Sequence, residues 1–463
     1  MAPRNNVTIL ESFQIAPSLG AVPELSIPLT CSDMFWFGFS LIHQITFYKH
    51  PVSRTCFNET IIPGLKNSLS LALKHFPSVA GNLVIPSNSI EPIIKYLDGN
   101  SVPFTIAETN SPGFEWFVGN QPRNCIEFYQ LIPQLPKSSE SGGLKMYPLI
   151  AFQVTMFPGE GFCIGITHNH VLGDDTSMYS FIKAWSTICK DGEYEATKRN
   201  ELSPIYDREV MKVYTKELDD VFWRNFRNTK LKEANMDGHF ISLAEDTDKE
   251  RTTFVISMED IQKLKKHVSD KQTSIKHLSS FTVVCAYVWT CLLKSGNARM
   301  NNVYEDEQEY ITFAVDCRGR PDPVIPRNYF GNCLVGCRIS AKTRQLCGDE
   351  GLFIATELIG DSIQQRVSYN GLLEGFKLLC NKAKVKEAIK LFSVAGSPRQ
   401  NYYNMDFGWG KPRKIEITSI DSTGAMSLSG CRDDSEGLEI GLALTKKIME
   451  SFTDIFSKGL ECL

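Results

Sequence analysis

The pattern of two strands with a turn between them is clearest in the stretch Pro148-Leu-Ile-Ala-Phe-Gln-Val-Thr-Met-Phe-Pro-Gly-Glu-Gly-Phe-Cys-Ile-Gly-Ile-Thr-His168. Residues 148–157 form a short, mostly apolar run, which is typical of a buried strand. The Pro-Gly-Glu-Gly run that follows is a strong turn signal. Residues 162–168 alternate apolar and smaller side chains, as strands do. The stretch therefore predicts a β-hairpin.

The hairpin leads into a predicted helix. Apolar residues recur at three- and four-residue steps from Met178 to Ile188, which is helical spacing. We expect this helix to begin near Thr176 or Ser177, because either side chain can cap it. Residues 168–175 then connect a strand to a helix, and loops held by rigid elements often carry chemistry.

Similar patterns extend in both directions along the chain. Apolar residues at helical spacing predict a helix over 61–76, which Pro77 stops. In the other direction we expect a short strand at 251–256, an amphipathic helix around 261–268 and a buried helix over 279–293. Strands and helices that alternate in both halves predict an α/β fold.

The polar segment 206–245 is expected to be a crossover linker. It separates an N-terminal domain over 1–205 from a C-terminal domain over 246–463, and we expect some exchange of chain between the two domains. A length of 463 residues is compatible with this division.

Composition narrows the classes of protein that need to be considered. The net charge is −4 and the sequence has no basic tract, so we expect no nucleic-acid partner and no anionic membrane partner. No apolar run approaches the length of a membrane span, and the polar N-terminus does not look like a secretory signal. The 14 scattered cysteines form no C-x-x-C pair. We therefore expect a cytoplasmic protein with free thiols. We also expect the protein to be a monomer.

The loop after the hairpin holds His168, His170, Asp174 and Asp175. The first interpretation is a general base, because an imidazole with an ordinary pKa of about 6.5 takes a proton from a hydroxyl at neutral pH. The second is a metal site, because two histidines of an H-x-H strand share one face, but the sequence lacks a third ligand that is equally well defined. The third is a structural turn, in which the histidines cap the turn and an aspartate caps the next helix. The segment alone leaves these three interpretations open.

Two glycine turns among aromatic residues stand in the C-terminal half. They are Tyr329-Phe-Gly-Asn-Cys333 and Asp406-Phe-Gly-Trp-Gly410. Two glycines around a tryptophan suggest a tight turn that holds the aromatic ring in place. A hairpin turn with a packing tryptophan fits that second segment equally well.

Taken together, these segments resemble the plant BAHD acyltransferases. His170–Asp174 is similar to the family's H-x-x-x-D motif and Asp406–Gly410 to its D-F-G-W-G motif, in the usual order and at about the usual spacing. The segment Leu29-Thr-Cys-Ser-Asp33 with Trp36 also looks like the family. So do the stretches 65–70, 75–81 and 153–158. The resemblance covers nearly the whole chain.

The Tyr329–Cys333 segment resembles one branch of that family more closely. This branch acylates the sugars of anthocyanins, flavonoids and related phenolic glucosides, with malonyl-CoA or hydroxycinnamoyl-CoA as donor. The resemblance implies two chloramphenicol-acetyltransferase-like domains, each a mixed sheet flanked by helices, with a solvent channel between them.

The resemblance also implies roles for individual residues. His170 would be the general base that deprotonates the acceptor hydroxyl in a ternary complex, with acyl-CoA as co-substrate and with no metal and no permanently bound cofactor. Asp174 would turn away from the channel and pair with an arginine. Arg318 and Arg320 are the candidates, and we prefer Arg318.

Further residues are expected at the donor or in the scaffold. The residues expected at the donor are Ser279, Ser280, Lys263, Lys265, Ser393, Gly396, Ser397 and Trp409. For each lysine a solvated helix face is an equal alternative. Asp406, Gly408 and Gly410 are expected to be structural.

Three positions depart from the family's pattern. Asn169 stands where a second histidine is common, and Asp175 stands where glycine is common. We expect Asp175 to cap the following helix, although an ionised carboxylate close to His170 would raise the pKa of its imidazole. Met178 stands where some malonyl-using relatives carry an arginine. The missing arginine weakens the case for a malonyl donor, but we favour malonyl because it is frequent in this branch. An aromatic acyl group is the alternative donor, and a different alcohol or an amine is the alternative acceptor.

Overall fold

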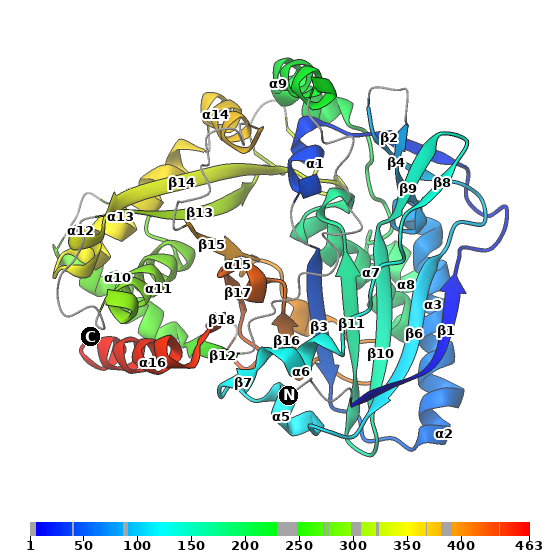
Figure 1. Cartoon of the computed structure of the whole chain (residues 1–463), viewed down its shortest axis with the longest axis horizontal. Coiled ribbons are helices and arrows are strands. Elements are labelled where there is room, and N and C mark those ends of the chain that lie inside the picture. The colour runs from blue at the N-terminus through cyan, green and yellow to red at the C-terminus, as the bar shows by residue number, and fades with distance from the viewer. Residues whose placement is uncertain are drawn as a thin grey trace.

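In the part of the chain that the structure describes, three β-sheets form the framework, two large and one small (Figure 1). The computed structural model describes residues 6–38, 41–86, 91–228, 248–271, 275, 277–297, 307–320, 324–366, 368–380, 391–434 and 436–463. Residues 229–245, the second part of the expected linker, lie outside the described residues.

The predicted hairpin stands at the centre of the first sheet. Strand β10 (Ile150–Phe157) pairs antiparallel with β11 (Gly161–His168), and both are buried along their whole length. The predicted hairpin is therefore confirmed. In spatial order the sheet consists of β1 (Val7–Ile15), β6 (Val102–Thr109), β10, β11, β3 (Ile42–Tyr48) and β16 (Lys414–Ile417). Because β6 and β10 run parallel while the other pairs are antiparallel, the sheet is mixed.

The second sheet is also mixed, since β15 runs parallel to both of its neighbours. Its spatial order is β14 (Leu334–Lys342), β13 (Gln308–Asp316), β15 (Leu391–Ala395), β17 (Met426–Gly430), β18 (Leu438–Thr445), β12 (Lys249–Ile256) and β7 (Arg123–Asn124). The predicted α/β class with two mixed sheets is confirmed.

The small third sheet was not predicted from the sequence. It is antiparallel and lies beside the first sheet. Its strands are β2 (Leu25–Pro28), β5 (Ile93–Tyr96), β4 (Asn82–Pro86), β9 (Leu144–Pro148) and β8 (Ser139–Ser141), in spatial order.

Each large sheet takes one edge strand from the other half of the chain. β16 pairs with β3 in the first sheet, and β7 pairs with β12 in the second. Glu416 on β16 forms ion pairs with Arg123 on β7 and with Arg251 on β12, each at 2.9 Å, and all three side chains are buried. Because breaking a buried ion pair costs about 3–5 kcal/mol, these contacts hold one sheet firmly against the other.

Helices cover both large sheets. The first core gathers apolar residues of β10 and β11 with those of α3 and α7, and the second gathers residues of α11, α13 and α16 with those of the second sheet. The helices are α1 (Cys31–Phe35), α2 (Arg54–Cys56), α3 (Ile62–His75), α4 (Pro77–Ala80), α5 (Phe114–Val118), α6 (Cys125–Tyr129), α7 (Asp175–Asp191), α8 (Glu193–Lys198), α9 (Glu209–Asn228), α10 (Met258–Lys271), α11 (Ser280–Asn297), α12 (Thr343–Cys347), α13 (Gly351–Gln365), α14 (Tyr369–Cys380), α15 (Ile420–Thr423) and α16 (Lys446–Glu461).

The segment expected to be a linker contains a long helix. α9 packs against α1 of the N-terminal half and α14 of the C-terminal half. Asp219 of α9 accepts a hydrogen bond from the backbone N–H of Cys31, at 2.6 Å. This part of the chain therefore takes part in positioning α1.

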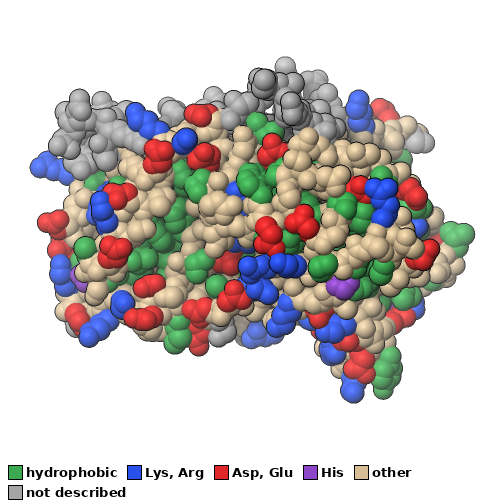
Figure 2. Space-filling model, turned by 90° about the horizontal axis from the view of Figure 1, so that it is seen from below, with side chains coloured by type: hydrophobic (Ala, Val, Ile, Leu, Met, Phe, Trp, Pro, Cys, Tyr) green, Lys and Arg blue, Asp and Glu red, His purple; other side chains and the backbone are tan. Residues whose placement is uncertain are grey.

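The surface carries charges of both signs. In the view of Figure 2, acidic and basic side chains lie intermixed over the face of the molecule, which agrees with the nearly equal numbers of basic and acidic residues, 49 and 53. Within the described part of the chain, no helix is both long and apolar enough to cross a membrane.

Candidate active site

His170 lies where the central strand β11 ends. It begins a single 3₁₀ turn, His170–Leu172, and Asn169 caps this turn by accepting a hydrogen bond from the backbone N–H of Val171, at 2.9 Å. A cap of this kind needs a short side chain with an acceptor oxygen. Asn169 therefore fixes the start of the loop. This role gives a structural reason for asparagine at a position where histidine is common.

Two side chains from distant parts of the sequence hold the ring of His170. The indole of Trp36 stacks on the imidazole, with 4.0 Å between the ring centroids and 7° between the planes. On the ring edge, Nδ1 of His170 lies 3.1 Å from Oδ1 of Asn332. Both residues stand in family-like segments of the sequence, but their local sequence did not predict that they belong to the site.

Burial keeps the imidazole of His170 neutral. It lowers the pKa of His170 below its ordinary value. A hydrogen bond with the backbone of His170 itself, the negative charge of Asp174 and the hydrogen bond with Asn332 only partly oppose this effect. A neutral imidazole at neutral pH has a lone pair that can accept a proton. The chemistry of the ring therefore fits a general base.

His168 differs from His170 in setting. Burial lowers the pKa of His168 to about 3, with smaller contributions from His170 and His43. His168 ends β11 whereas His170 belongs to the following turn, so the two do not form the H-x-H strand that a metal site would use. Among the described residues, no three His, Cys, Asp or Glu side chains are grouped as a metal site requires.

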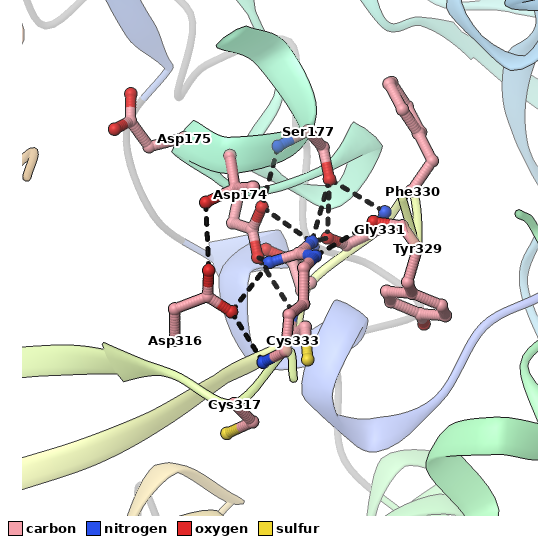
Figure 3. A network of polar contacts seen from close by, with 12 residues as sticks. Asp174, Asp175, Ser177, Asp316, Cys317, Tyr329, Phe330, Gly331 and Cys333 are labelled. Atoms are coloured by element: carbon pink, nitrogen blue, oxygen red, sulfur yellow. Dashed lines mark hydrogen bonds and ion pairs between the residues drawn. The ribbon is translucent and has the colours of Figure 1, made fainter. Parts of the chain in front are cut away.

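Asp174 caps α7 at the centre of a network of polar contacts (Figure 3), and it forms an ion pair with Arg318. Two contacts join the pair: Nη1 of Arg318 is 2.8 Å from Oδ2 of Asp174, and Nη2 is 3.0 Å from Oδ1. The same carboxylate accepts hydrogen bonds from the backbone N–H groups of Ser177 and Cys333. Burial alone would raise the pKa of Asp174, but the charge of Arg318 and these hydrogen bonds hold it below its ordinary value.

These contacts correct one expectation and agree with another. The helix cap is Asp174 rather than Thr176 or Ser177, because its carboxylate is already held in place by Arg318. The arginine that pairs with Asp174 is the preferred Arg318, whereas Nε of Arg320 donates to the backbone oxygen of Asp316.

The Tyr329–Cys333 segment closes over the same loop. The backbone oxygen of Gly331 accepts hydrogen bonds from Ser177 and Arg318, both at 2.9 Å (Figure 3). Gly331 has a φ of 149°, and a Cβ at this position would lie 2.5 Å from Nη2 of Arg208. Only glycine fits such a position. This segment, which served in the sequence only to indicate a branch of the family, is thus part of the site.

A buried ion pair lies behind Asn332. Nε of Arg208 is 3.1 Å from Oδ2 of Asp33, and both side chains are almost wholly excluded from solvent. Oδ1 of Asp33 accepts hydrogen bonds from the backbone N–H of Asn332 and from its side-chain Nδ2. Arg208 lies within the expected linker, so nothing in its local sequence marked it as a residue of the site.

Asp175 does not cap the helix, contrary to expectation. It is the first residue of α7, and its Oδ1 accepts a hydrogen bond from the hydroxyl of Tyr402, at 2.7 Å. Its Oδ2 is shielded from solvent and has no hydrogen-bond partner among the described residues. Burial raises the pKa of Asp175 to about 6, against the effect of the Tyr402 hydrogen bond, and the charges of Asp174 and Asp316 raise it further.

Residues 5–458 match the Transferase family. The chain is 40% identical to phenolic glucoside malonyltransferase 1 of Nicotiana tabacum, an alignment that covers 98% of this chain and 100% of that protein. The chain belongs to this family, the BAHD acyltransferases. It is also 36% identical to a malonyl-coenzyme A:anthocyanin 3-O-glucoside-6''-O-malonyltransferase of Dahlia pinnata, with 98% of each chain covered.

Solved structures show the same fold. The crystal structure of vinorine synthase matches this BAHD acyltransferase with a TM-score of 0.65 and 21% identity over 96% of each chain. Fusarium graminearum TRI101 in complex with ethyl coenzyme A matches with a TM-score of 0.64 and 16% identity, over 92% of this chain and 96% of that one. The prediction of an acyltransferase with this fold is confirmed.

The second glycine segment of this BAHD acyltransferase lies at the other end of α7. Oδ1 of Asp406 accepts hydrogen bonds from the backbone N–H groups of Gly408 and Gly410, and Oδ2 is 2.6 Å from Nζ of Lys190. The ring of Trp409 packs edge-on against Phe162, near Gly64 of α3. At about 1.5 Å per residue, the 17 residues of α7 separate Lys190 from the His170 loop by about 25 Å.

The residues expected at the donor fall into separate groups. Nζ of Lys265 donates to Oγ of Ser280, at 3.0 Å, so α10 and the start of α11 meet there. Ser279 accepts a hydrogen bond from the backbone N–H of Thr282, at 3.1 Å. Lys263 pairs with Glu259 on the exposed side of α10, which is the solvated-face alternative.

The remaining residues that were expected to bind the donor lie on or next to the second sheet. Ser393 lies on β15, opposite Thr312 of β13. Gly396 has a φ of 82°, and a Cβ there would lie 2.8 Å from the backbone oxygen of Leu428. The hydroxyl of Ser397 accepts a hydrogen bond from the backbone N–H of Arg399. None of these contacts brings Ser393, Gly396 or Ser397 against Trp409.

Met178 is part of the first core. Its side chain is only 2% exposed and packs with the apolar residues of α3 and α7. In this structure the position therefore favours neither a malonyl nor an aromatic donor.

Proposed function

We propose that the protein transfers a malonyl group from malonyl-CoA to a sugar hydroxyl of a phenolic glucoside such as an anthocyanin or flavonoid glucoside. Three relatives that are 36–40% identical over 98% of this chain are malonyltransferases of anthocyanin or phenolic glucosides by name. A coumaroyl-CoA:anthocyanidin 3-O-glucoside-6''-O-coumaroyltransferase of Arabidopsis thaliana is less similar, at 32%. This difference favours malonyl over the aromatic donor.

The proposed mechanism rests on the environment of the His170 imidazole. A neutral imidazole held between Trp36 and Asn332 has the lone pair and the fixed orientation that a general base requires. His170 takes the proton of the acceptor hydroxyl as the oxygen attacks the thioester carbonyl of the donor. The tetrahedral intermediate then collapses, the bond to sulfur breaks, and the imidazolium returns its proton to the CoA thiolate. The transfer occurs in a ternary complex, without an acyl-enzyme.

The remaining assignments belong to the same proposal. Asp174 and Arg318 hold the loop that carries His170. The donor is bound by Ser279, Ser280, Lys265, Ser393, Gly396 and Ser397, and the acceptor and donor reach His170 through a channel between a domain over 1–205 and a domain over 246–463. Lys263 and Trp409, which were also expected at the donor, have contacts that support it less. The enzyme acts as a monomer in the cytoplasm.

A donor and acceptor panel tests the substrate assignment. Purified protein is offered malonyl-CoA, coumaroyl-CoA and acetyl-CoA against flavonoid glucosides, with mass spectrometry of the products. We expect a malonylated glucoside. Transfer of only the coumaroyl group would replace the donor, and no acylated glucoside with any donor would refute the proposal.

The variant His170→Ala tests the base. Since a positioned base contributes about 10²–10⁴-fold to the rate, kcat should fall by about that factor while the melting temperature stays near that of the wild type. A His170→Ala variant with the wild-type kcat would remove His170 from the mechanism.

An amine acceptor is the alternative that a specific relative supports. An agmatine coumaroyltransferase of Arabidopsis thaliana is 32% identical over 98% of this chain. Agmatine is therefore added to the acceptor panel, and an acylated agmatine without an acylated glucoside would decide for the amine.

A further inference from the structure

The side-chain amide of Asn332 lies fully buried between His170 and Asp33. Its Oδ1 is 3.1 Å from Nδ1 of His170. Its Nδ2 is 2.9 Å from the backbone oxygen of His170 and 3.3 Å from Oδ1 of Asp33. Because an amide oxygen only accepts hydrogen bonds and an amide nitrogen only donates them, the two ends of this amide are not interchangeable.

Asp33 decides which way the amide faces. Its carboxylate is paired with Arg208 and also accepts the backbone N–H of Asn332, and a carboxylate of this kind can only accept. If the amide were turned over, its oxygen would face the carboxylate of Asp33 and the backbone oxygen of His170. Opposed acceptors in a buried site are strongly unfavourable. The amide nitrogen therefore faces Asp33, and the amide oxygen faces the imidazole.

The orientation of Asn332 determines which nitrogen of His170 carries the hydrogen. A neutral imidazole has one N–H donor and one lone pair. Since Oδ1 of Asn332 is an acceptor, the nitrogen that faces it, Nδ1, must be the donor. The lone pair then stands on Nε2.

Trp36 reinforces this arrangement. Its indole lies nearly parallel to the imidazole at 4.0 Å, so the ring cannot turn over in place without displacing the indole. An aromatic face is also attractive to a cation. The indole is therefore suited to the imidazolium that forms during the reaction.

We propose that Asn332 is a positioning residue, oriented by Asp33 and Arg208, that keeps His170 in the Nδ1–H tautomer and so makes Nε2 the atom that takes the acceptor's proton. The inference rests on His170 being the base, as proposed above. When Nε2 takes the proton from the acceptor hydroxyl, the imidazolium still donates its Nδ1–H to Asn332. When Nε2 passes that proton to the departing thiolate, the ring returns to its starting tautomer without rotating.

Nitrogen NMR tests the tautomer without any substrate. The full-length protein is labelled with ¹⁵N only in its histidine rings, and the His170→Gln variant identifies the His170 signals by their loss. At neutral pH we expect a protonated Nδ1 and an unprotonated Nε2. A protonated Nε2 in the wild-type protein would overturn the proposal. If Nδ1 is protonated but the wild-type protein transfers no acyl group, the tautomer assignment stands and the proposed function fails.

Kinetics of two asparagine variants test the positioning role. Asn332→Ala removes the side-chain acceptor that faces Nδ1 and should lower kcat by about 10²-fold, with KM for both substrates within about twofold of wild type. Asn328→Ala is the matched control, because Asn328 directly precedes the Tyr329–Cys333 segment and donates to the backbone oxygen of Ser203 at the surface. Equal kcat values in the two variants would contradict the proposal.

The variant Asn332→Asp separates positioning from packing. The new carboxylate can still accept from Nδ1–H, and its negative charge favours the imidazolium, so the pKa of His170 should rise by about one unit. The acid limb of kcat/KM should move to higher pH by the same amount, and kcat should exceed that of Asn332→Ala by about tenfold. Asp174 and His168, the titratable neighbours of the ring, are unchanged.

Two outcomes of this variant are decisive. A folded Asn332→Asp protein with the kcat of Asn332→Ala and an unmoved acid limb would overturn the proposal. If the new carboxylate beside Asp33 prevents folding, the wild-type tautomer measurement decides.

Discussion

The segments Tyr329–Cys333 and Asp406–Gly410 look alike in sequence, yet they hold opposite ends of α7. The first closes over the N-terminal end, where Asp174 and His170 lie. The second meets Lys190, one residue before the C-terminal end. Both segments point to the same family, but only the first touches the loop of the proposed base. A recognisable motif is therefore no guide to its distance from the chemistry.

The two contacts also differ in physical kind. Two guanidinium nitrogens of Arg318 donate to the carboxylate of Asp174, and both side chains are almost fully buried. Lys190 meets Asp406 through a single contact, with the side chains 44% and 19% exposed. A buried pair is costly to break, because the charge left behind has lost its solvation. An exposed pair contributes little, because water and salt screen it.

The largest expected difference comes from removing each carboxylate. Asp174→Ala should lower the free energy of unfolding by about 3–5 kcal/mol and abolish activity. Asp406→Ala should lower it by about 1–2 kcal/mol, since one exposed ion pair and two backbone hydrogen bonds are lost. Urea unfolding followed by circular dichroism measures both values. Equal losses would show that the two ends of α7 are held equally strongly.

The pH dependence of the Asp174 contribution has a definite sign. The pKa of Asp174 is lower in the folded protein than its ordinary value. Its stabilisation is therefore fully present above the ordinary aspartate pKa and is lost as the pH falls through the folded value. The gap between wild type and Asp174→Ala should accordingly narrow in strong acid, and a constant gap would contradict this origin.

A methyl group added to one glycine of each segment should have a smaller effect. Gly331→Ala places a Cβ against the guanidinium of Arg208 at a positive φ. Gly410→Ala also has a positive φ, but its Cβ meets no atom of the described residues within 4 Å. We expect losses in the free energy of unfolding of about 2–4 kcal/mol and about 1 kcal/mol, respectively. Activity should fall only for Gly331→Ala. A larger loss at Gly410 would reverse the comparison.

Trp409→Ala distinguishes a packing role from a donor-binding role. Because the ring packs on Phe162 and is only partly buried, its removal should lower the free energy of unfolding by about 1–3 kcal/mol. The KM for malonyl-CoA should stay within about twofold of wild type, measured with Phe162→Leu as a control for the same contact. A KM raised about tenfold without a change in stability would place Trp409 at the donor instead.

A smaller effect than those at Asp174 and Gly331 is expected at Asp175. Its pKa is about 6 in the folded protein against an ordinary value of 3.8, so the folded state disfavours its ionised form. This cost is absent below the ordinary value, grows between the two values and is complete above pH 6. Asp175→Asn, which still accepts from Tyr402, should therefore stabilise the protein by about 1–2 kcal/mol above pH 6. It should have almost no effect near pH 4. Unfolding measured near pH 4 and above pH 6 tests this, and an equal gain in stability at both pH values would contradict the explanation.

Much of the fold follows from local patterns in the sequence. The β10–β11 hairpin, α3 and α11 lie where apolar periodicity and turn residues predict them, because these signals act between near neighbours. The cap of α7 was predicted to be Thr176 or Ser177, and it is Asp174 instead. Three side chains near this start can serve as caps, and Arg318 and Cys333 from another part of the chain select among them.

Edge strands were beyond local prediction for a related reason. β7 has two residues and β16 has four, which is too short for alternation to be visible. Each is defined by pairing with a strand more than a hundred residues away. Such pairing depends on sheets that must already exist.

The sequence by itself determined the family, the α/β class, the candidate base His170 and the partnership of Asp174 with an arginine. Only the tertiary structure brought Trp36, Arg208 and Asn332 to that base, together with Asp33. These residues share no periodicity and stand far apart in the chain. Their roles come from directional contacts between buried groups, and such contacts exist only once the two sheets and the helix α9 are packed together.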